Sequence, residues 1–563
     1  MKRLLFLPAL CAAILGVSWG AYRAALPAEP ELSRFVPSGP LLYLRAGNFS
    51  SLLSDWDGSE EKTTWVKSKN YDQFSNSRLL LRLKDAGTEF SSAAGLPADA
   101  KLLQQVAGKQ TAFALYDIGK LQFLYITRAS SDFSGSTLWQ TRAKFESRFA
   151  GGVNFYYRKD PDSEREVAFA TTGDYVLLAT RLDLMVGALE LIAQGKGHSI
   201  EEDAWWLRAT SVSGAPGDLR MILNLEKIVP SPYFRSYWVP RNVTEMKQYS
   251  SAISDLTRAG SEYREERTLF RKTRAPSDGA AGPGASAVAD LLRLAPKDGG
   301  FYAATADPTP GYCLELFARK LLATHEGPAA PQKTAPQVQL GNGDVGAASD
   351  LERRIDQPLA KNTGTADNRS ALQDLFLSNR VLAELHVHGT DRDPAGVFVR
   401  IHSGVAFLSE APWDERKVQN ALVEFVRPEF TTGQLGLGWK SVAGYSVLDG
   451  LWPLAVAVRG KYLIVSNDPA ILASMLEGLN KKTDVTPANF DATFRHRREQ
   501  ENFVVLTKML DRETGQTGGG VPEFFSENIA SLSFALKSVV SEKITIRDSG
   551  DRQTQTVVYA WAR

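Results

Sequence analysis

An internal repeat constrains this chain more than any other feature of its sequence. Residues 32–37 (LSRFVP) and residues 291–296 (LLRLAP) are each followed, six positions past the proline, by a tyrosine, Tyr43 or Tyr302. The offset is the same for both features (291 − 32 = 259 and 302 − 43 = 259). The repeat predicts two related halves, so that a residue at any proposed site can be compared with its twin.

A second and longer repeated segment lies further along each half. Residues 167–178 align with residues 454–465 at an offset of 287 (454 − 167), and each segment carries a Gly-x-Tyr turn, at Gly173 and at Gly460. Two short apolar or β-rich runs flank each turn, which is typical of a hairpin.

The order of elements predicts an α+β fold of two tandem homologous domains, each a mainly antiparallel sheet with packed helices. Each half opens with a short strand, continues through a helical region to a hairpin, and then has a helix. The Gly-x-Tyr hairpin, an amphipathic helix and closing strands follow. The helix after the first hairpin is expected near residues 138–149 and 415–425. Closing strands are expected at residues 219–225 and 253–256 of the first half, and their equivalents in the second half are expected at residues 503–509 and 529–532.

A length of 563 residues is too great for one core. We expect a targeting segment, a first repeat, a linker rich in Ala, Gly and Pro, and a second repeat. The second repeat contains an insertion with no hydrophobic period, which is expected to be disordered. The expected bounds are 1–22, 23–274, 275–290 and 291–563, with the insertion at about 327–349.

The N-terminus has the character of an export signal. Lys2 and Arg3 precede the apolar residues 4–19, and small residues around Gly20 form a tolerable cleavage site. The apolar run also approaches the length of a spanning helix, so cleavage and retention as a membrane anchor both remain open. We therefore expect an exported protein in the periplasm or on the extracytoplasmic side of a bacterial inner membrane.

Composition narrows the classes of partner. The net charge of +1 offers no basic surface for nucleic acid. The chain has two cysteines, Cys11 and Cys313, and Cys11 lies in the targeting segment. An exported chain of this size without an internal disulfide fits a bacterial envelope better than a eukaryotic secretory route.

The opening Pro-x6-Tyr strands, the Gly-x-Tyr hairpins and the acidic-aromatic residues 199–206 together carry a family resemblance. The chain resembles uncharacterised exported bacterial proteins built on a duplicated α+β domain of unknown function, and the resemblance covers most of the mature chain. It implies the fold and export, and it implies no activity, substrate or catalytic residue.

Three histidines form the only candidate metal site. His386 and His388 alternate on one expected strand and therefore share a face, and His402 lies on the partner strand. Three histidines with Glu384 could hold zinc if the turn places His402 on the same face. The first half carries Tyr116, Ile118 and about Arg128 at the positions expected to match, so a solvated polar strand is the ordinary alternative.

No motif of a nucleophilic enzyme or of a cofactor site is present. The sequence lacks Gly-x-Ser-x-Gly, His-Glu-x-x-His and a phosphate-binding Gly-Lys-Ser/Thr. Cys313 lies on an apolar helical pattern and is expected to be a buried thiol. The sequence does not decide whether the protein is an enzyme, but it favours a protein without catalytic activity. A metal-dependent hydrolase that uses the three histidines is the less favoured alternative.

We expect a non-enzymatic binding, scaffold or assembly component of the envelope, with an envelope protein or an apolar ligand as its partner. The alternative is a periplasmic carrier of a lipid or other apolar ligand, which predicts an internal pocket lined by the hairpins of both copies. A partner surface between the copies would use aromatic anchors. The candidates are Trp205, Trp206, Trp238, Trp439 and Trp452.

Overall fold

A computed structural model describes most of the chain. The described residues are 30–68, 71–72, 75–76, 78–129, 133–212, 214–232, 246–274, 282–317, 321, 371–392, 399–430, 438–442, 444–449, 453–482, 485–502 and 538–562. The targeting segment and the expected insertion at 327–349 lie outside these ranges, as do residues 503–509 and 529–532 of the expected closing strands.

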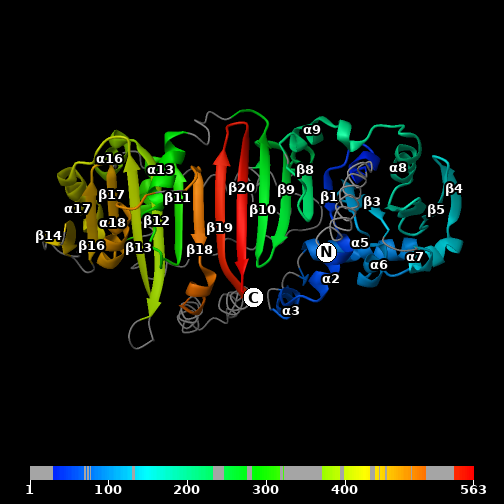
Figure 1. The fold of residues 1–563 in the computed structure, drawn as a ribbon, viewed down its shortest axis with the longest axis horizontal. Coiled ribbons are helices and arrows are strands. Elements are labelled where there is room, and N and C mark those ends of the chain that lie inside the picture. The colour runs from blue at the N-terminus through cyan, green and yellow to red at the C-terminus, as the bar shows by residue number, and fades with distance from the viewer. Residues whose placement is uncertain are drawn as a thin grey trace, which may run out of the picture.

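All twenty strands of the described residues join one antiparallel sheet (Figure 1). The first half contributes β1 (Leu42–Ala46), β2 (Thr111–Asp117), β3 (Gln122–Arg128), β4 (Glu146–Ala150), β5 (Val153–Lys159), β6 (Glu166–Thr172), β7 (Tyr175–Ala179), β8 (Leu219–Asn224), β9 (Tyr249–Ala259) and β10 (Glu262–Arg271). The second half contributes β11 (Phe301–Ala306), β12 (Val381–Arg392), β13 (Val399–Ser409), β14 (Gly438–Val442), β15 (Tyr445–Asp449), β16 (Leu454–Arg459), β17 (Tyr462–Ser466), β18 (Phe490–Phe494), β19 (Val539–Asp548) and β20 (Arg552–Trp561).

Both halves pair their strands in the same order from the outer edge to the centre. The first half runs β4-β5-β6-β7-β3-β2-β1-β8-β9-β10. The second half runs β14-β15-β16-β17-β13-β12-β11-β18-β19-β20. The two series meet where β10 pairs antiparallel with β20, from Glu262 opposite Ala560 to Phe270 opposite Arg552. The expected two sheets are therefore one, because the last strands of both halves pair with each other.

Helices cover both faces of the sheet. On one face, called here the α8 face, lie α8 (Leu182–Gln194), α9 (Ala204–Thr210), α13 (Pro283–Leu292) and α18 (Pro469–Gly478). On the other, the α5 face, lie α5 (Arg78–Ala94), α6 (Ala100–Val106), α7 (Thr137–Gln140), α14 (Pro310–Phe317), α16 (Ala371–Asn379) and α17 (Glu415–Phe430). The short helices α2 (Phe49–Asp57), α3 (Glu60–Val66) and α10 (Leu225–Ile228) complete the first half.

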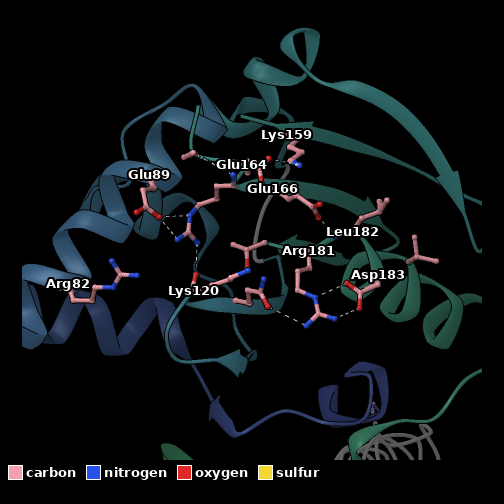
Figure 2. Close-up of a pocket in the computed structure, with 14 residues that line it drawn as sticks. Arg82, Glu89, Lys120, Lys159, Glu164, Glu166, Arg181, Leu182 and Asp183 are labelled. Carbon is pink, nitrogen blue, oxygen red and sulfur yellow. Dashed lines mark hydrogen bonds and ion pairs between the residues drawn. The ribbon is translucent and has the colours of Figure 1, made fainter. Parts of the chain in front are cut away.

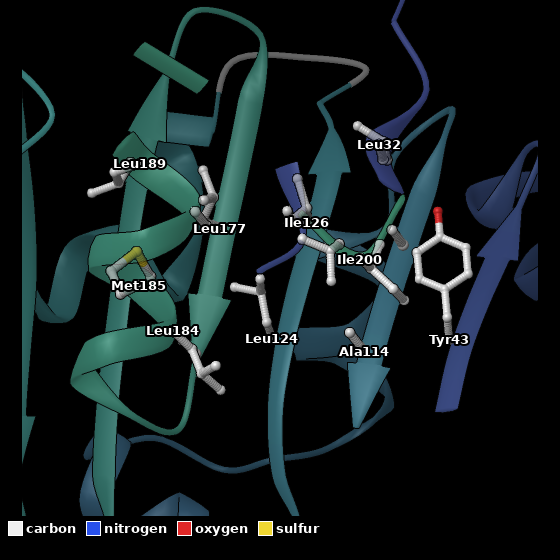
Figure 3. Packing of buried hydrophobic residues seen from close by; sticks show 14 of the residues in the cluster. Leu32, Tyr43, Ala114, Leu124, Ile126, Leu177, Leu184, Met185, Leu189 and Ile200 are labelled. Carbon is white, nitrogen blue, oxygen red and sulfur yellow. The ribbon is translucent and has the colours of Figure 1, made fainter. Parts of the chain in front are cut away.

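Alternation along the strands divides the core between these faces. On β3, Leu124 and Ile126 are fully buried against the α8 face, whereas Tyr125 belongs to the core of the α5 face. Figure 3 shows Leu124 and Ile126 packed with Leu184 of α8 and with Tyr43. Strands with helices on both faces need apolar residues at every position, and this explains the continuous apolar runs in the sequence.

The Gly-x-Tyr hairpins and the helices that follow them are confirmed. Gly173 turns β6 into β7 and Gly460 turns β16 into β17, both with positive φ (57° and 59°), a conformation that glycine adopts without steric cost. The helices α8 and α18 follow in equivalent places. Pro469 lies in the first turn of α18, where a missing N–H is harmless.

Part of the expected linker is a helix. Residues 275–281 lie outside the described ranges, but α13 begins at Pro283, and its Val288 and Leu291 are fully buried against β11 and β12. The Gly-Pro-Gly composition suggested a flexible chain. Pro283 instead stands in the first turn of α13, and the small residues of this helix allow it to pack closely on the sheet.

Two further expectations were wrong. The segment expected as a helix near 138–149 contains only the short α7 and a 3-10 turn before strand β4 begins at Glu146. The closing strands were matched incorrectly between the halves. By their pairings, β8 corresponds to β18 and β9 to β19, rather than to residues 503–509 and 529–532.

Candidate functional site

The three histidines do not converge. His386 and His388 lie opposite Val405 and Ser403 on the α5 face, whereas His402 lies opposite Gly389. Residues directly opposite each other share a face, and 402 differs from 403 by one position, so His402 points to the α8 face. Among the described residues, no three His, Cys, Asp or Glu side chains lie together as metal ligands would.

His386 belongs to a buried polar group on the α5 face. Its Nδ1 lies 3.3 Å from Oε2 of Glu384, and the Tyr312 hydroxyl of α14 donates to the other carboxylate oxygen at 3.3 Å. The ring of Phe301 stacks on His388 with 4.5 Å between centroids. Burial, with Glu384 nearby, raises the pKa of the Cys313 thiol to about 12, so that this thiol stays protonated and inert at neutral pH.

His402 connects a strand to the start of a helix. Its Nδ1 lies 2.5 Å from Oδ2 of Asp468, the residue that caps α18, and its Nε2 lies 3.6 Å from Asp391. Asp468 raises the pKa of His402 and is itself held at a lower pKa by that contact. In the first half the equivalent residues are Gln122 and Arg181, which also interact. The pair is therefore a structural link between the two elements.

The tryptophans do not form one surface. Trp206 is buried and packs edge-on against Tyr43, while the indole N–H of Trp205 donates to Asp203 at 3.1 Å. Trp439 lies on β14, the outermost strand at the far end of the sheet from α9. Trp238 and Trp452 lie outside the described residues.

An apolar pocket of about 720 Å³ lies on the α5 face of the first half. Its floor is the sheet from β7 to β8, and its walls are α5, α6 and the start of α2. Five aromatic side chains provide much of its surface, and the rings of Phe113 and Phe123 lie 5.2 Å apart. Its lining is Leu44, Ala46, Phe49, Phe90, Ala98, Asp99, Ala100, Leu102, Leu103, Val106, Thr111, Phe113, Phe123, Tyr125, Leu178 and Leu219.

The few polar groups of this pocket are already used within the protein. The Tyr125 hydroxyl donates to the backbone oxygen of Val106 at 2.8 Å, and the Thr111 hydroxyl bonds to that of Thr127 at 2.8 Å. The Asp99 carboxylate caps α6 by accepting from the N–H of Leu102. The pocket therefore presents hydrocarbon and aromatic surface, which favours an apolar ligand.

The second half has polar residues at the equivalent place. Tyr43 lies opposite Ala114 and its twin Tyr302 lies opposite Val387, so the neighbouring Phe113 corresponds to His386 and Thr111 to Glu384. The twins expected from the sequence, Tyr116 and Ile118, were wrong by three residues. Tyr312 covers this place, so the pocket belongs to the first half rather than to the hairpins of both copies.

A charged cleft of about 750 Å³ lies in the first half (Figure 2). It is bordered by the β2–β3 turn, the end of β5, the start of β6, α5 and the start of α8. Arg165 is its most buried cation and forms an ion pair with Glu89 of α5. Its charged residues are Arg82, Lys120, Lys159, Arg165 and Arg181, with Glu89, Glu164, Glu166 and Asp183.

Sequence reasoning missed both cavities. The one available signal is the aromatic character of a single strand face, Phe113 on β2 with Phe123 and Tyr125 on β3, opposite smaller aliphatic residues on the other face. Whether such a face is filled by helices or left partly open depends on where α5 and α6 pack.

No protein-family model matches the chain, and no curated protein matches it. Solved structures titled "Structure of crystal form I of TP0453" and "Structure of crystal form III of TP0453" each share 11% identity with it at a TM-score of 0.24. They cover 44% and 45% of this chain, and 82% and 84% of their own. A similarity of that size supports no conclusion about function.

Within the described part of the chain, none of the helices combines the length and hydropathy that a bilayer crossing requires.

Proposed function

We propose that this protein is a non-enzymatic, exported protein of the bacterial envelope that binds an apolar ligand in the pocket of its first half. The observation that carries the proposal is the pocket itself, which has a volume of about 720 Å³ and a lining of aliphatic and aromatic side chains. This volume lies within the range of small-molecule sites, about 300–1,000 Å³.

Three features support binding over catalysis. The sequence has no nucleophile motif, the histidines lie on two faces of the sheet, and the Cys313 thiol is buried and protonated. Export rests on the basic and apolar N-terminal residues 2–19. A scaffold role based on tryptophan anchors has less support, because Trp206 packs in the core and Trp205 and Trp439 lie far apart along the sheet.

The substitution Ala46→Phe tests this function. Ala46 lines the pocket from β1, and a phenyl ring there would occupy the space of a ligand. We expect the wild-type full chain to bind the neutral fluorophore N-phenyl-1-naphthylamine saturably, with one site per chain, and the variant to bind at least about tenfold more weakly.

Val66→Phe is the matched control. Val66 is an exposed residue of α3 that does not line the pocket, so a phenyl ring added there should leave binding unchanged. Circular dichroism would establish that both variants fold. Equal affinity of Ala46→Phe and wild type would contradict the proposal, as would failure of the wild type to bind the fluorophore.

A further inference from the structure

The apolar pocket and the charged cleft are neighbours along the same two elements. On β3, Gln122 lines the cleft and the next residue, Phe123, lines the pocket; on α5, Glu89 and Phe90 do the same. The N–H of Phe123 donates to the Thr180 hydroxyl, a cleft group, at 2.8 Å. Gln122 and Phe123 are consecutive on a strand, so their side chains lie on opposite faces of the sheet, and the two cavities adjoin on the α5 face through Glu89 and Phe90.

Two aromatic rings of the pocket lie next to cleft residues in the chain. The centroids of Phe90 and Phe123 lie 6.3 Å apart, a loose contact at the upper end of the range for interacting rings. Glu89, which precedes Phe90 on α5, holds Arg165, whose Nη1 donates to the backbone oxygen of Lys120 at 2.8 Å.

The cleft carries unbalanced positive charge. Each of its four carboxylates has a partner: Glu89 pairs with Arg165, Asp183 with Arg181 and Glu164 with Lys159, and Glu166 accepts from the N–H of Leu182. Two cations remain. Arg82 donates only to the backbone oxygen of Gly119, and the Lys120 ammonium contacts no charged group among the described residues.

The start of α6 brings one acidic residue to the lining of the pocket. Asp99 and the exposed residues Ala98, Ala100 and Leu103 form the solvent-accessible end of the lining, at the start of α6. Asp99 is the only charged residue of the lining, so an anionic group would be repelled there.

We infer that the ligand of this protein is an anionic amphiphile, with its hydrocarbon chain in the apolar pocket and its acidic group in the charged cleft near Lys120 and Arg82. This inference rests on the proposed function. It names a chemical class whose simplest member is a long-chain carboxylic acid.

The test compares two ligands with the same chain. Dodecanoate and dodecanol would each compete with bound N-phenyl-1-naphthylamine on the full-length protein, below the concentrations at which either aggregates. We expect dodecanoate to bind at least about tenfold more tightly than dodecanol. Acetate, which has the acid without the chain, should not compete.

Lys120→Gln removes the uncompensated charge, and Lys84→Gln is the matched control, since Lys84 is an exposed residue of α5 outside both cavities. We expect Lys120→Gln to weaken dodecanoate several-fold and to leave dodecanol unchanged, while Lys84→Gln changes neither. Equal binding of the acid and the alcohol to the wild type would overturn the inference and leave the proposed function intact. Failure of the fluorophore and of both ligands would instead overturn the proposed function.

Discussion

At the scale of single residues, the His402–Asp468 contact shows how a strand is linked to a helix. Asp468 precedes Pro469, caps α18 through the N–H of Ala470, and holds the imidazole of His402 on β13. Asp391 reinforces the charged imidazolium from β12, and Arg400 opposes it. Burial also opposes the charge, but the direct bond to Asp468 is the larger influence on the pKa.

The raised pKa of His402 predicts a pH dependence of stability. A group whose pKa is raised on folding stabilises the fold fully below its unfolded pKa, about 6.5, and loses that contribution as the pH rises through the folded value. The lowered pKa of Asp468 acts in the opposite direction, losing its contribution as the pH falls below about 4. The contact should therefore stabilise the fold most between about pH 4 and 6.5.

His402→Gln introduces the residue of the twin position, Gln122, and tests this prediction. We expect the urea midpoint of the wild type to fall relative to that of the variant as the pH rises from 6 to 9. Urea unfolding at several pH values measures the difference. A difference that stays constant over this range would show that the imidazole does not carry the charge.

The His386, His388 and His402 pattern shows the limit of sequence reasoning for single residues. Alternation correctly places His386 and His388 on one face, because side chains on a strand alternate. The face of His402 depends on hairpin register, and a shift of one residue reverses every side chain. Strand β13 pairs with β17 as well as with β12, so its place in the sheet involves a contact between distant segments.

At the scale of elements, the pairing of β10 with β20 joins the halves and has a different interaction at each end. At one end, Arg271 donates to both carboxylate oxygens of Asp548, at 2.6 and 2.5 Å. At the other end, the equivalent residues are Trp561 and Arg258, which both contact the Tyr263 ring. Two backbone hydrogen bonds are equivalent as well. The N–H of Arg271 donates to the carbonyl oxygen of Asp551, and the N–H of Trp561 donates to that of Ser261.

Arg271→Met should destabilise the protein. The Arg271 side chain is 9% exposed and that of Asp548 is 17% exposed, so removing the guanidinium leaves a largely buried carboxylate without its partner. We expect a loss of about 2–3 kcal/mol in the free energy of unfolding, somewhat below the range for fully buried pairs. Urea denaturation measures it.

Arg264→Met on the same strand is the control for that substitution. Arg264 pairs with Glu266, and both side chains are more than half exposed, so the loss should stay below about 1 kcal/mol. Equal losses from both substitutions would show that the pair between the halves has no special weight.

At the scale of the whole molecule, one sheet passes through both halves without a break (Figure 1). The junction is a strand pair, and β10 pairs with both β9 and β20. Strand β10 pairs with β9 and β20, and β20 pairs with β19 and β10. If the last strand of one half unfolds, the last strand of the other half therefore loses a hydrogen-bonded partner. We therefore expect the halves to unfold together.

Phe407→Ala tests this coupling. Phe407 is fully buried in the second half, and its truncation should cost about 3–5 kcal/mol. Hydrogen exchange should show faster global opening in β1 to β3 of the first half as well as in β12 and β13. Phe169→Ala, equally buried in the first half, should affect the second half in the same way. Full protection of β1 to β3 in Phe407→Ala would contradict the coupling.

The sequence by itself determined the repeat, the α+β class, the Gly-x-Tyr hairpins and the helices after them. These features are local, since they depend on the conformation of glycine, on the placement of proline and on apolar periodicity. Only the tertiary structure decided that the two halves share one sheet, that His402 faces away from His386, and that the first half holds an apolar pocket where the second has Glu384 and His386. Each of these depends on strand register and on helix packing between distant segments, and local periodicity carries no information about either.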